Sequence, residues 1–456
     1  MIAAEHRKLH KRAMTPLMLV FAVFCCVSGG PYGLEPLVGE AGPGLALLLI
    51  ALMPIVWALP DALTTCELAP ALPVEGGYIV WVKRALGPFA GFLNAWWTWI
   101  YTLVDAALYP VLFTTYLSSF LSLFFGFDGL EQPAARWATT MAVIAAFTWL
   151  NVRGTRLVGK TSTAFAFALI VPFLALVLIG LTRMAFDPQP IVREFTSGGQ
   201  TLQAGLASGM AIVMWNYLGW DALSTIAEEV EEPAKAYPRA LLIGVPLVFA
   251  VYFFPTLVGL AYFPNTEDWA EGAWPAIGQA VGGPGLGVAL NVAGLISPIA
   301  LFTASLLASS RVPFVMAEDG FLPKGLVAIH PVFGTPWRAI LLHGVIYALL
   351  AHKSFLELIE LNVIMYSAAL FLESLTLFVL RVKEPGLHRP FKVPGGLWGV
   401  GLVAVLPVSV ACVMVGVSIV EEGWEAQWSS AVALASGPLA FWLARLAARA
   451  KPGWFC

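Results

Sequence analysis

Charged residues are scarce in this sequence of 456 residues: only 12% are Asp, Glu, Lys or Arg, about half the roughly 25% of an ordinary soluble domain. Hydrophobic residues make up 59%. A soluble protein must cover its surface with wettable side chains, so this composition excludes a soluble enzyme and a disordered chain. No basic excess exists either, which excludes a nucleic-acid-binding protein. The sequence therefore predicts an all-α membrane protein.

Cysteine patterns and catalytic groupings are also missing. The five cysteines have neither the spacing of a disulfide framework nor that of a metal site, and we interpret them as small hydrophobic side chains. His6 and His10 lie near the N-terminus and His343 is isolated. With no nucleophile and base at a recognisable spacing, we expect no enzymatic activity, no metal and no cofactor other than a coupling ion.

Long apolar stretches are abundant. A helix that crosses the hydrocarbon core needs about 20 residues, and twelve stretches of suitable length follow one another with short connections. The predicted spans are 15–42, 44–70, 89–123, 134–152, 159–184, 204–231, 237–262, 285–312, 336–352, 355–380, 398–420 and 428–449. This division predicts an N-terminal tail (1–14), a first group of five spans (15–184), a second group of five (204–380) and a final pair (398–449).

The basic residues indicate the orientation. With twelve spans both termini lie on one side, and all but four of the 25 Lys and Arg residues fall on that side or at its boundary. The exceptions are Arg136, Arg183, Arg193 and Lys353. Positive charge collects on the cytoplasmic side of bilayers, so we expect both termini in the cytoplasm and a plasma or bacterial inner membrane. The first thirty residues also have the pattern of a signal peptide, but the apolar pattern resumes at Leu34, which favours one interrupted helix.

Two predicted spans contain helix-breaking sequence. Residues 28–33 read Ser-Gly-Gly-Pro-Tyr-Gly, and Pro31 suits the first turn of a second half-helix. Residues 214–221 read Met-Trp-Asn-Tyr-Leu-Gly-Trp-Asp. Irregular backbone survives in a membrane only where it is buried in protein or lines a cavity. Interruptions at matching positions of two five-span groups are typical of inverted-repeat transporters with a site at the membrane midplane; the alternative is a simple kink packed with aromatic side chains.

Several segments, taken in order, carry a family resemblance: 28–35, 67–78, 215–233, 311–323 and 381–394. Together they resemble the amino acid–polyamine–organocation superfamily of transporters. The stretch that begins Asp105-Ala-Ala-Leu-Tyr109-Pro110 is similar to the polyamine:proton symporters best known from plants. The resemblance implies a LeuT-like fold, in which two inverted repeats of five helices, with helices 1 and 6 broken, are followed by two more helices. It also implies transport by alternating access.

Carboxylates outnumber bases at the predicted membrane depth. The acids are Glu35, Asp61, Glu67, Asp105, Asp221 and Glu373, whereas the bases are Lys160 and His343. Each charge at mid-membrane costs about 2.5–3.5 kcal/mol on insertion scales, so an acidic cavity indicates a cationic substrate. We predict that Glu35, Asp105 and Asp221 bind ammonium groups, and that Glu67 makes a structural ion pair. A structural hydrogen bond or ion pair is the alternative for each acid.

Residues around these acids complete the predicted substrate site. Gly29 and Gly30 supply the irregular backbone. Ring faces that attract cations, or else plain packing, are predicted for Tyr32, Tyr109, Trp215, Tyr217 and Trp220. Carriers of amino acids hold the substrate carboxylate on N–H groups of the first break. Because Pro31 removes one such donor and Glu35 adds negative charge, the sequence favours an amine without a carboxylate.

Proton coupling is expected from the resemblance. In proton-coupled members of the superfamily a lysine of span five occupies the place where sodium-coupled relatives bind an ion, and Lys160 matches it, with Ser305 as a hydroxyl partner. The alternative for Lys160 is an anchor at the cytoplasmic interface. Residues 264–283, with Trp269 and Trp274, are expected to form a lid over the outer vestibule or else a solvated loop.

The sequence thus predicts a proton-coupled importer of polyamines such as putrescine or spermidine. An amino-acid symporter or exchanger of the same fold is an alternative, as is a non-transporting membrane sensor. The expected partners are a small cationic substrate and the lipid bilayer, without nucleic acid, and a monomer is compatible with the sequence.

Overall fold

The computed structural model describes residues 15–74, 76–153, 158–318, 322–425 and 427–450, and within these ranges all regular secondary structure is helical. Seven helices are long and apolar enough to cross a membrane by length and composition. They are Pro43–Ala71, Pro88–Phe125, Phe167–Phe186, Pro233–Tyr262, Pro284–Thr303, Phe355–Lys383 and Gly396–Glu422. The expectation of an all-α membrane protein is therefore confirmed.

Helices occupy each predicted span. In the first half of the chain they are α1 (Pro16–Val27), α2 (Glu35–Ala41), α3 (Pro43–Met53), the π-helical turn η1 (Pro54–Ala58), α4 (Leu59–Ala71), α5 (Gly77–Leu86), α6 (Pro88–Phe125), η2 (Gly129–Glu131), α7 (Pro133–Val152), α8 (Val158–Phe186) and η3 (Ser197–Gly199). The second half comprises α9 (Leu202–Asn216), η4 (Ala222–Glu229), α10 (Pro233–Tyr262), η5 (Thr266–Asp268), α11 (Trp274–Gly282), α12 (Pro284–Ser309), α13 (Arg311–Glu318), η6 (Lys324–Val327), α14 (Trp337–Leu350), α15 (Phe355–Lys383), α16 (Gly396–Glu422) and α17 (Trp428–Ala450).

The first predicted interruption is present between α1 and α2. Gly30 and Gly33 adopt φ angles of +82° and +84°, which a residue with a side chain rarely adopts. The position expected for Pro31 is wrong, however. The second half-helix begins at Glu35 and carries Pro36 in its first turn, so Pro31 lies in the irregular segment and its carbonyl accepts a hydrogen bond from Leu34 N at 3.1 Å.

The second predicted interruption follows α9. Residues 217–221 are not helical, and Gly219 has a φ of +93°. A 3₁₀-helix, η4, then continues the chain. Both breaks therefore fall where glycine permits a backbone that an α-helix cannot contain.

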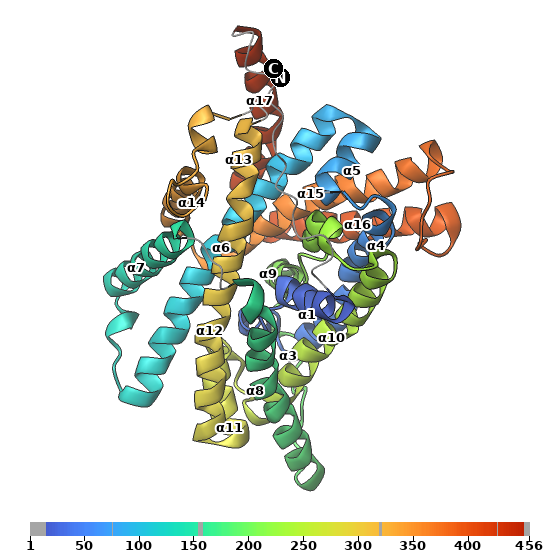
Figure 1. Cartoon of the computed structure of the whole chain (residues 1–456). Helices are drawn as coiled ribbons and strands as arrows, with labels where there is room; N and C mark the ends of the chain where they lie inside the picture. Colours follow the sequence, from blue (N-terminus) through green and yellow to red (C-terminus); the bar gives the residue numbers. More distant parts are fainter. Residues whose placement is uncertain (1–14, 75, 154–157, 319–321, 426, 451–456) are drawn as a thin grey trace.

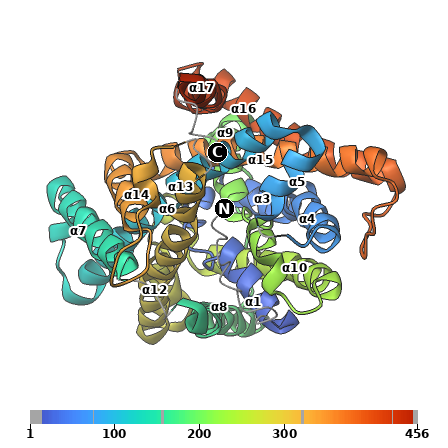
Figure 2. The ribbon, with the colours of Figure 1, turned by 45° about the horizontal axis from the view of Figure 1, so that its top comes forward.

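The longest helix, α6, runs through the molecule and packs against α12 and α15, while α1 packs against α8 and α10 (Figures 1 and 2). Helices α7 and α14 lie side by side at one flank, and α16 extends at the opposite flank (Figures 1 and 2). Helix α1 therefore reaches its break beside α8 and α10, and α9 reaches its break beside α2 and α15.

Candidate functional site

A cavity of about 310 Å³ opens between the two breaks, α6 and α12. Seven of the predicted substrate and coupling residues line it: Gly29, Gly30, Tyr32, Asp105, Tyr109, Trp215 and Ser305. They come from segments far apart in the sequence, and the interruption of α1 and α9 is what brings their side chains and backbone to one place.

Asp105 is the acid of this cavity. Its Oδ2 accepts a hydrogen bond from Tyr109 Oη at 2.6 Å, and its Oδ1 accepts one from Trp215 Nε1 at 3.0 Å. The carboxylate is only partly buried, so it can still contact a ligand. Among the described residues that line the cavity there is no other acid and no Lys, Arg or His. The described cavity wall therefore carries one acidic side chain and no basic one.

Glu35 lies outside this wall and is fully buried. Its carboxylate accepts hydrogen bonds from Gly33 N at 2.7 Å and Gly272 N at 3.3 Å, and from the hydroxyl of Tyr116. Gly33 belongs to the first break, Tyr116 to α6, and Gly272 to the connection before α11. Glu35 thus ties three elements together beside the break.

The segment 264–283, which runs from the end of α10 through α11, covers the same side of the break. Trp269 and Trp274 are almost completely buried, and Trp274 Nε1 donates a hydrogen bond of 2.8 Å to the carbonyl of Pro31. These contacts pack the segment onto the first break and contradict the alternative of a solvated loop, while its position over an outer vestibule stays a prediction; we call this segment the lid. Because Cys25 and Cys26 of α1 also line the cavity, the cavity extends along α1, away from this lid.

Three predicted residues of the second break, Tyr217, Trp220 and Asp221, do not line the cavity. Asp221 accepts a hydrogen bond from Tyr366 Oη at 3.0 Å, and the same hydroxyl contacts Asp61. Tyr217 Oη donates to Ile50 O at 3.2 Å, and Trp220 Nε1 donates to Tyr217 O at 2.9 Å. Both rings are buried in the helix packing. The side chain of Lys160, the other proton-coupling candidate, lies outside the described residues.

Sequence reasoning missed several residues of the cavity wall. Besides the two cysteines, these include Tyr101, Tyr252 and Asn362, and two serines of α12, Ser297 and Ser309. The spacing of Tyr101 and Asp105, one helical turn apart on α6, is a signal that could have identified Tyr101. The others carry no pattern that separates them from ordinary packing residues.

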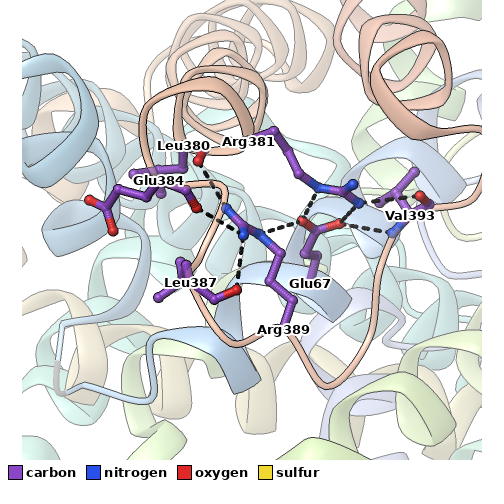
Figure 3. Close-up of polar contacts among 7 residues, drawn as sticks. All are labelled: Glu67, Leu380, Arg381, Glu384, Leu387, Arg389 and Val393. Carbon is purple, nitrogen blue, oxygen red and sulfur yellow. Dashed lines mark hydrogen bonds and ion pairs between the residues drawn. The ribbon is translucent and has the colours of Figure 1, made fainter.

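The predicted structural ion pair of Glu67 is confirmed, and it is larger than a pair (Figure 3). Arg381 approaches both oxygens of Glu67, at 2.5 and 2.6 Å, and Arg389 Nε lies 3.0 Å from Oε1. Val393 N donates to Oε2 at 2.8 Å. The other nitrogens of Arg389 donate to the carbonyls of Leu380, Glu384 and Leu387. Together these contacts fasten the end of α4 to the end of α15 and the segment that follows it.

An exposed ion pair lies beside this cluster. Arg84 Nη2 is 2.6 Å from Glu384 Oε2, with 45% and 31% of the two side chains exposed. Hydrogen bonding to this guanidinium lowers the pKa of the Glu384 carboxyl below its ordinary value. In the connection near the lid, burial raises the pKa of Glu271, although the charge of Arg136 acts in the opposite direction.

The comparisons with known proteins agree with this architecture. The family model for amino acid permeases matches residues 17–440. A probable polyamine transporter of Arabidopsis thaliana is 35% identical over 413 residues, which cover 90% of this chain and 80% of that protein. A polyamine transporter of Oryza sativa subsp. japonica is 33% identical over 408 residues, covering 89% and 74%. A branched-chain amino acid permease of Bacillus subtilis is 26% identical over 375 residues, covering 78% and 77%.

The predicted resemblance is therefore confirmed, and the expected absence of enzymatic activity agrees with relatives that are named as transporters. The match extends over both breaks, Asp105 and the lid. With its membrane-spanning helices and its cavity between two interrupted ones, the chain belongs to the amino acid permease family of the amino acid–polyamine–organocation superfamily of transporters.

Proposed function

We propose that this transporter is a proton-coupled symporter that imports organic cations, most specifically polyamines such as putrescine or spermidine, by alternating access. Its twelve helical regions are twelve spans of a LeuT-like inverted repeat, with both termini in the cytoplasm of a plasma or bacterial inner membrane. Lys160 and Ser305 belong to the proposed proton pathway, and the proton is the only coupling ion. The observation that carries the proposal is the cavity with one carboxylate and, among its described lining residues, no basic side chain.

The charge of the cavity selects the substrate. An ammonium group near Asp105 interacts with it by about 4 kcal/mol at 4 Å and an effective dielectric constant of about 20. The rings of Tyr109 and Trp215 already hold the carboxylate in place through their hydrogen bonds, so little side-chain freedom is lost on binding. A neutral or anionic ligand gains none of this attraction.

Glu35 disfavours an amino acid. Carriers of this fold that take amino acids bind the substrate carboxylate on backbone N–H groups of a broken helix. Here the N–H group of Gly33 already donates to Glu35 at 2.7 Å. An incoming carboxylate would have to displace an internal one and would meet its charge. The names of the plant relatives, which are polyamine transporters, support the same choice.

The position of the cavity suggests which conformation of the transport cycle this is. Contacts of Glu35 and Trp274 close the side of the lid, while the cavity continues along α1 toward the N-terminal side of the break. With the proposed orientation, this is a conformation closed to the outside. In this conformation Asp105 is the contact for an ammonium group, whereas Glu35 and Asp221 lie outside the cavity lining and act on the ligand only at a distance.

Uptake into proteoliposomes tests the proposal. Labelled putrescine and spermidine are offered with and without an imposed pH gradient, against unlabelled amino acids and amines as competitors. We expect accumulation that needs the gradient, is inhibited by diamines and is lost in Asp105→Asn. Asp128→Asn, an exposed acid in the connection after α6, is the matched control and should transport normally.

Other results would point to the alternatives. Competition by amino acids but not by diamines would establish an amino-acid symporter. Uptake that ignores the gradient would remove proton coupling. Binding of amines without any flux would indicate a sensor.

A further inference from the structure

A second polar centre lies behind the cavity wall, between α4, the second break and α15. Its members are Asp61, Asp221 and Tyr366, of which Asp61 and Asp221 are each 2% exposed and Tyr366 1%. The hydroxyl of Tyr366 contacts Asp61 Oδ2 and lies 3.0 Å from Asp221 Oδ1. The N–H group of Gly219 donates to the same hydroxyl oxygen at 3.2 Å. Two carboxylates therefore meet at one phenol.

The phenol of Tyr366 has only one hydrogen atom to offer to the two carboxylates. A tyrosine hydroxyl has a single hydrogen to donate, and its oxygen can also accept. One acceptor position is taken by Gly219 N, and the single O–H can serve only one of the two carboxylates. The other carboxylate oxygen can approach the phenol favourably only if it carries a proton of its own and donates it. The geometry thus requires one proton shared between Asp61 and Asp221.

The surroundings of Asp61 and Asp221 decide which of the two acids holds the shared proton. The backbone N–H groups of Asp221 and Ala222 act on the carboxylate of Asp221, and such donors stabilise an ionised carboxylate. Asp61 Oδ1, by contrast, is buried and has no hydrogen-bond partner in the described part of the chain. A buried, unpartnered oxygen is costly for an ionised carboxylate and much less so for a neutral acid. The protonated member in this conformation is Asp61.

The ionisable neighbours of Asp61 and Asp221 also favour a proton on this pair. Glu373 of α15 interacts electrostatically with both acids, and its Oε1 accepts from Asn94 Nδ2 at 3.1 Å. The remaining titratable groups that act on this centre are Tyr101 of α6, Tyr78 of α5 and Cys26 of α1. Among the described residues no cationic side chain acts on Asp61 or Asp221.

The centre touches the substrate cavity without being part of it. Gly219 and Tyr101 line the cavity, and the ring of Tyr101 contacts that of Tyr366 edge to face, with centroids 5.0 Å apart. Gly219 and Asp221 both belong to the second break. A movement of that break therefore alters the cavity wall and the partners of Tyr366 together.

We propose that Asp61, Tyr366 and Asp221 form the site that carries the coupling proton, with Asp61 as its holder in this conformation; the inference rests on the proposed proton coupling. The transfer is a relay. The O–H bond of Asp61 Oδ2 breaks as its proton passes to the oxygen of Tyr366, while the phenol proton passes to Asp221 Oδ1. Asp61 becomes a carboxylate, Asp221 becomes a neutral acid and the tyrosine is unchanged. Displacement of the second break then separates the loaded Asp221 from Tyr366.

Two transport assays on the full chain in proteoliposomes test the site. Asp61→Asn reproduces the shape and the donor of a protonated acid but cannot release a proton. We expect it to lose pH-gradient-driven accumulation of putrescine while retaining counterflow, the exchange of labelled for unlabelled putrescine at equal pH, within a few-fold of the wild type. Tyr366→Phe, which breaks the relay, should behave likewise. Tyr347→Phe, which removes another fully buried hydroxyl from α14, should retain both activities.

An infrared measurement tests the stored proton directly. The wild type should show the carbonyl absorption of a protonated carboxyl group, and this absorption should fall by one group in either Asp61→Asn or Asp221→Asn. Full gradient-driven accumulation by Asp61→Asn would overturn the inference, and so would an unchanged absorption in both variants. If Asp61→Asn loses counterflow as well, the infrared absorption alone decides whether Asp61 holds the proton. A wild type that accumulates no amine under any gradient would instead refute the proposed function, whatever the infrared spectrum shows.

Discussion

Removal of the Glu67 charge should destabilise the protein strongly. Glu67 is completely buried, and the side chains of Arg381 and Arg389 are only 13% and 2% exposed. Glu67→Gln keeps the side-chain volume but leaves two guanidinium groups without their shared counterion. Breaking a buried ion pair by removing one partner costs about 3–5 kcal/mol, and the amide nitrogen of glutamine cannot accept from Val393 N. We therefore expect a loss near that range.

The matched control is Arg84→Gln, which breaks the exposed pair with Glu384. Exposed pairs contribute about 0–1 kcal/mol, so the two substitutions should differ by at least about 2 kcal/mol. Unfolding by titration with sodium dodecyl sulfate in mixed micelles, followed by tryptophan fluorescence, measures both free energies. If Glu67→Gln lies within about 1 kcal/mol of the wild type, the carbonyl contacts of Arg389 suffice to hold this region and the reasoning is wrong.

Three further predictions concern the breaks and the cavity. A Cβ at Gly33 would lie 2.8 Å from the ring of Trp215 at a φ of +84°, so Gly33→Ala should abolish putrescine uptake, and normal uptake would contradict this close packing. Cys26 is exposed and lines the cavity; with the other reactive cysteines replaced by serine, a water-soluble methanethiosulfonate should block uptake, and putrescine should slow the reaction. An equal rate of modification with and without putrescine would place its site elsewhere. Trp274→Phe removes a hydrogen bond to Pro31 O, worth about 1 kcal/mol, so hydrogen exchange of the first break should quicken roughly fivefold, and unchanged exchange would show that the indole does not secure the lid.

The helices and their interruptions could be predicted from the sequence because both depend on local chemistry. Apolar runs of about 20 residues have few alternatives to membrane helices, and glycine with proline at 28–33 cannot continue one. The start of α2 could not be placed in the same way, since two prolines, Pro31 and Pro36, fit a first helical turn equally well. Only the packing of the break decides between them.

The roles of the three predicted acids depended on long-range contacts. Asp105, Glu35 and Asp221 look alike in the sequence, yet only Asp105 lines the cavity. The Gly272 N–H group that helps to satisfy Glu35 is 237 positions away, and the tyrosine that serves Asp221 is 145 positions away. A backbone donor leaves no trace in residue type, so its partner could not be recognised beforehand.

The π-helical turn between α3 and α4, Pro54–Ala58, changes the direction in which the side chains of α4 point. A turn of this kind accommodates one residue more than an α-helical turn, and one residue corresponds to about 100° of rotation around a helix with 3.6 residues per turn. The part of the second span that follows this turn is therefore rotated about the helix axis relative to its beginning. This rotation contributes to the directions of both acids of α4, of which Asp61 points toward Tyr366 and Glu67 toward Arg381.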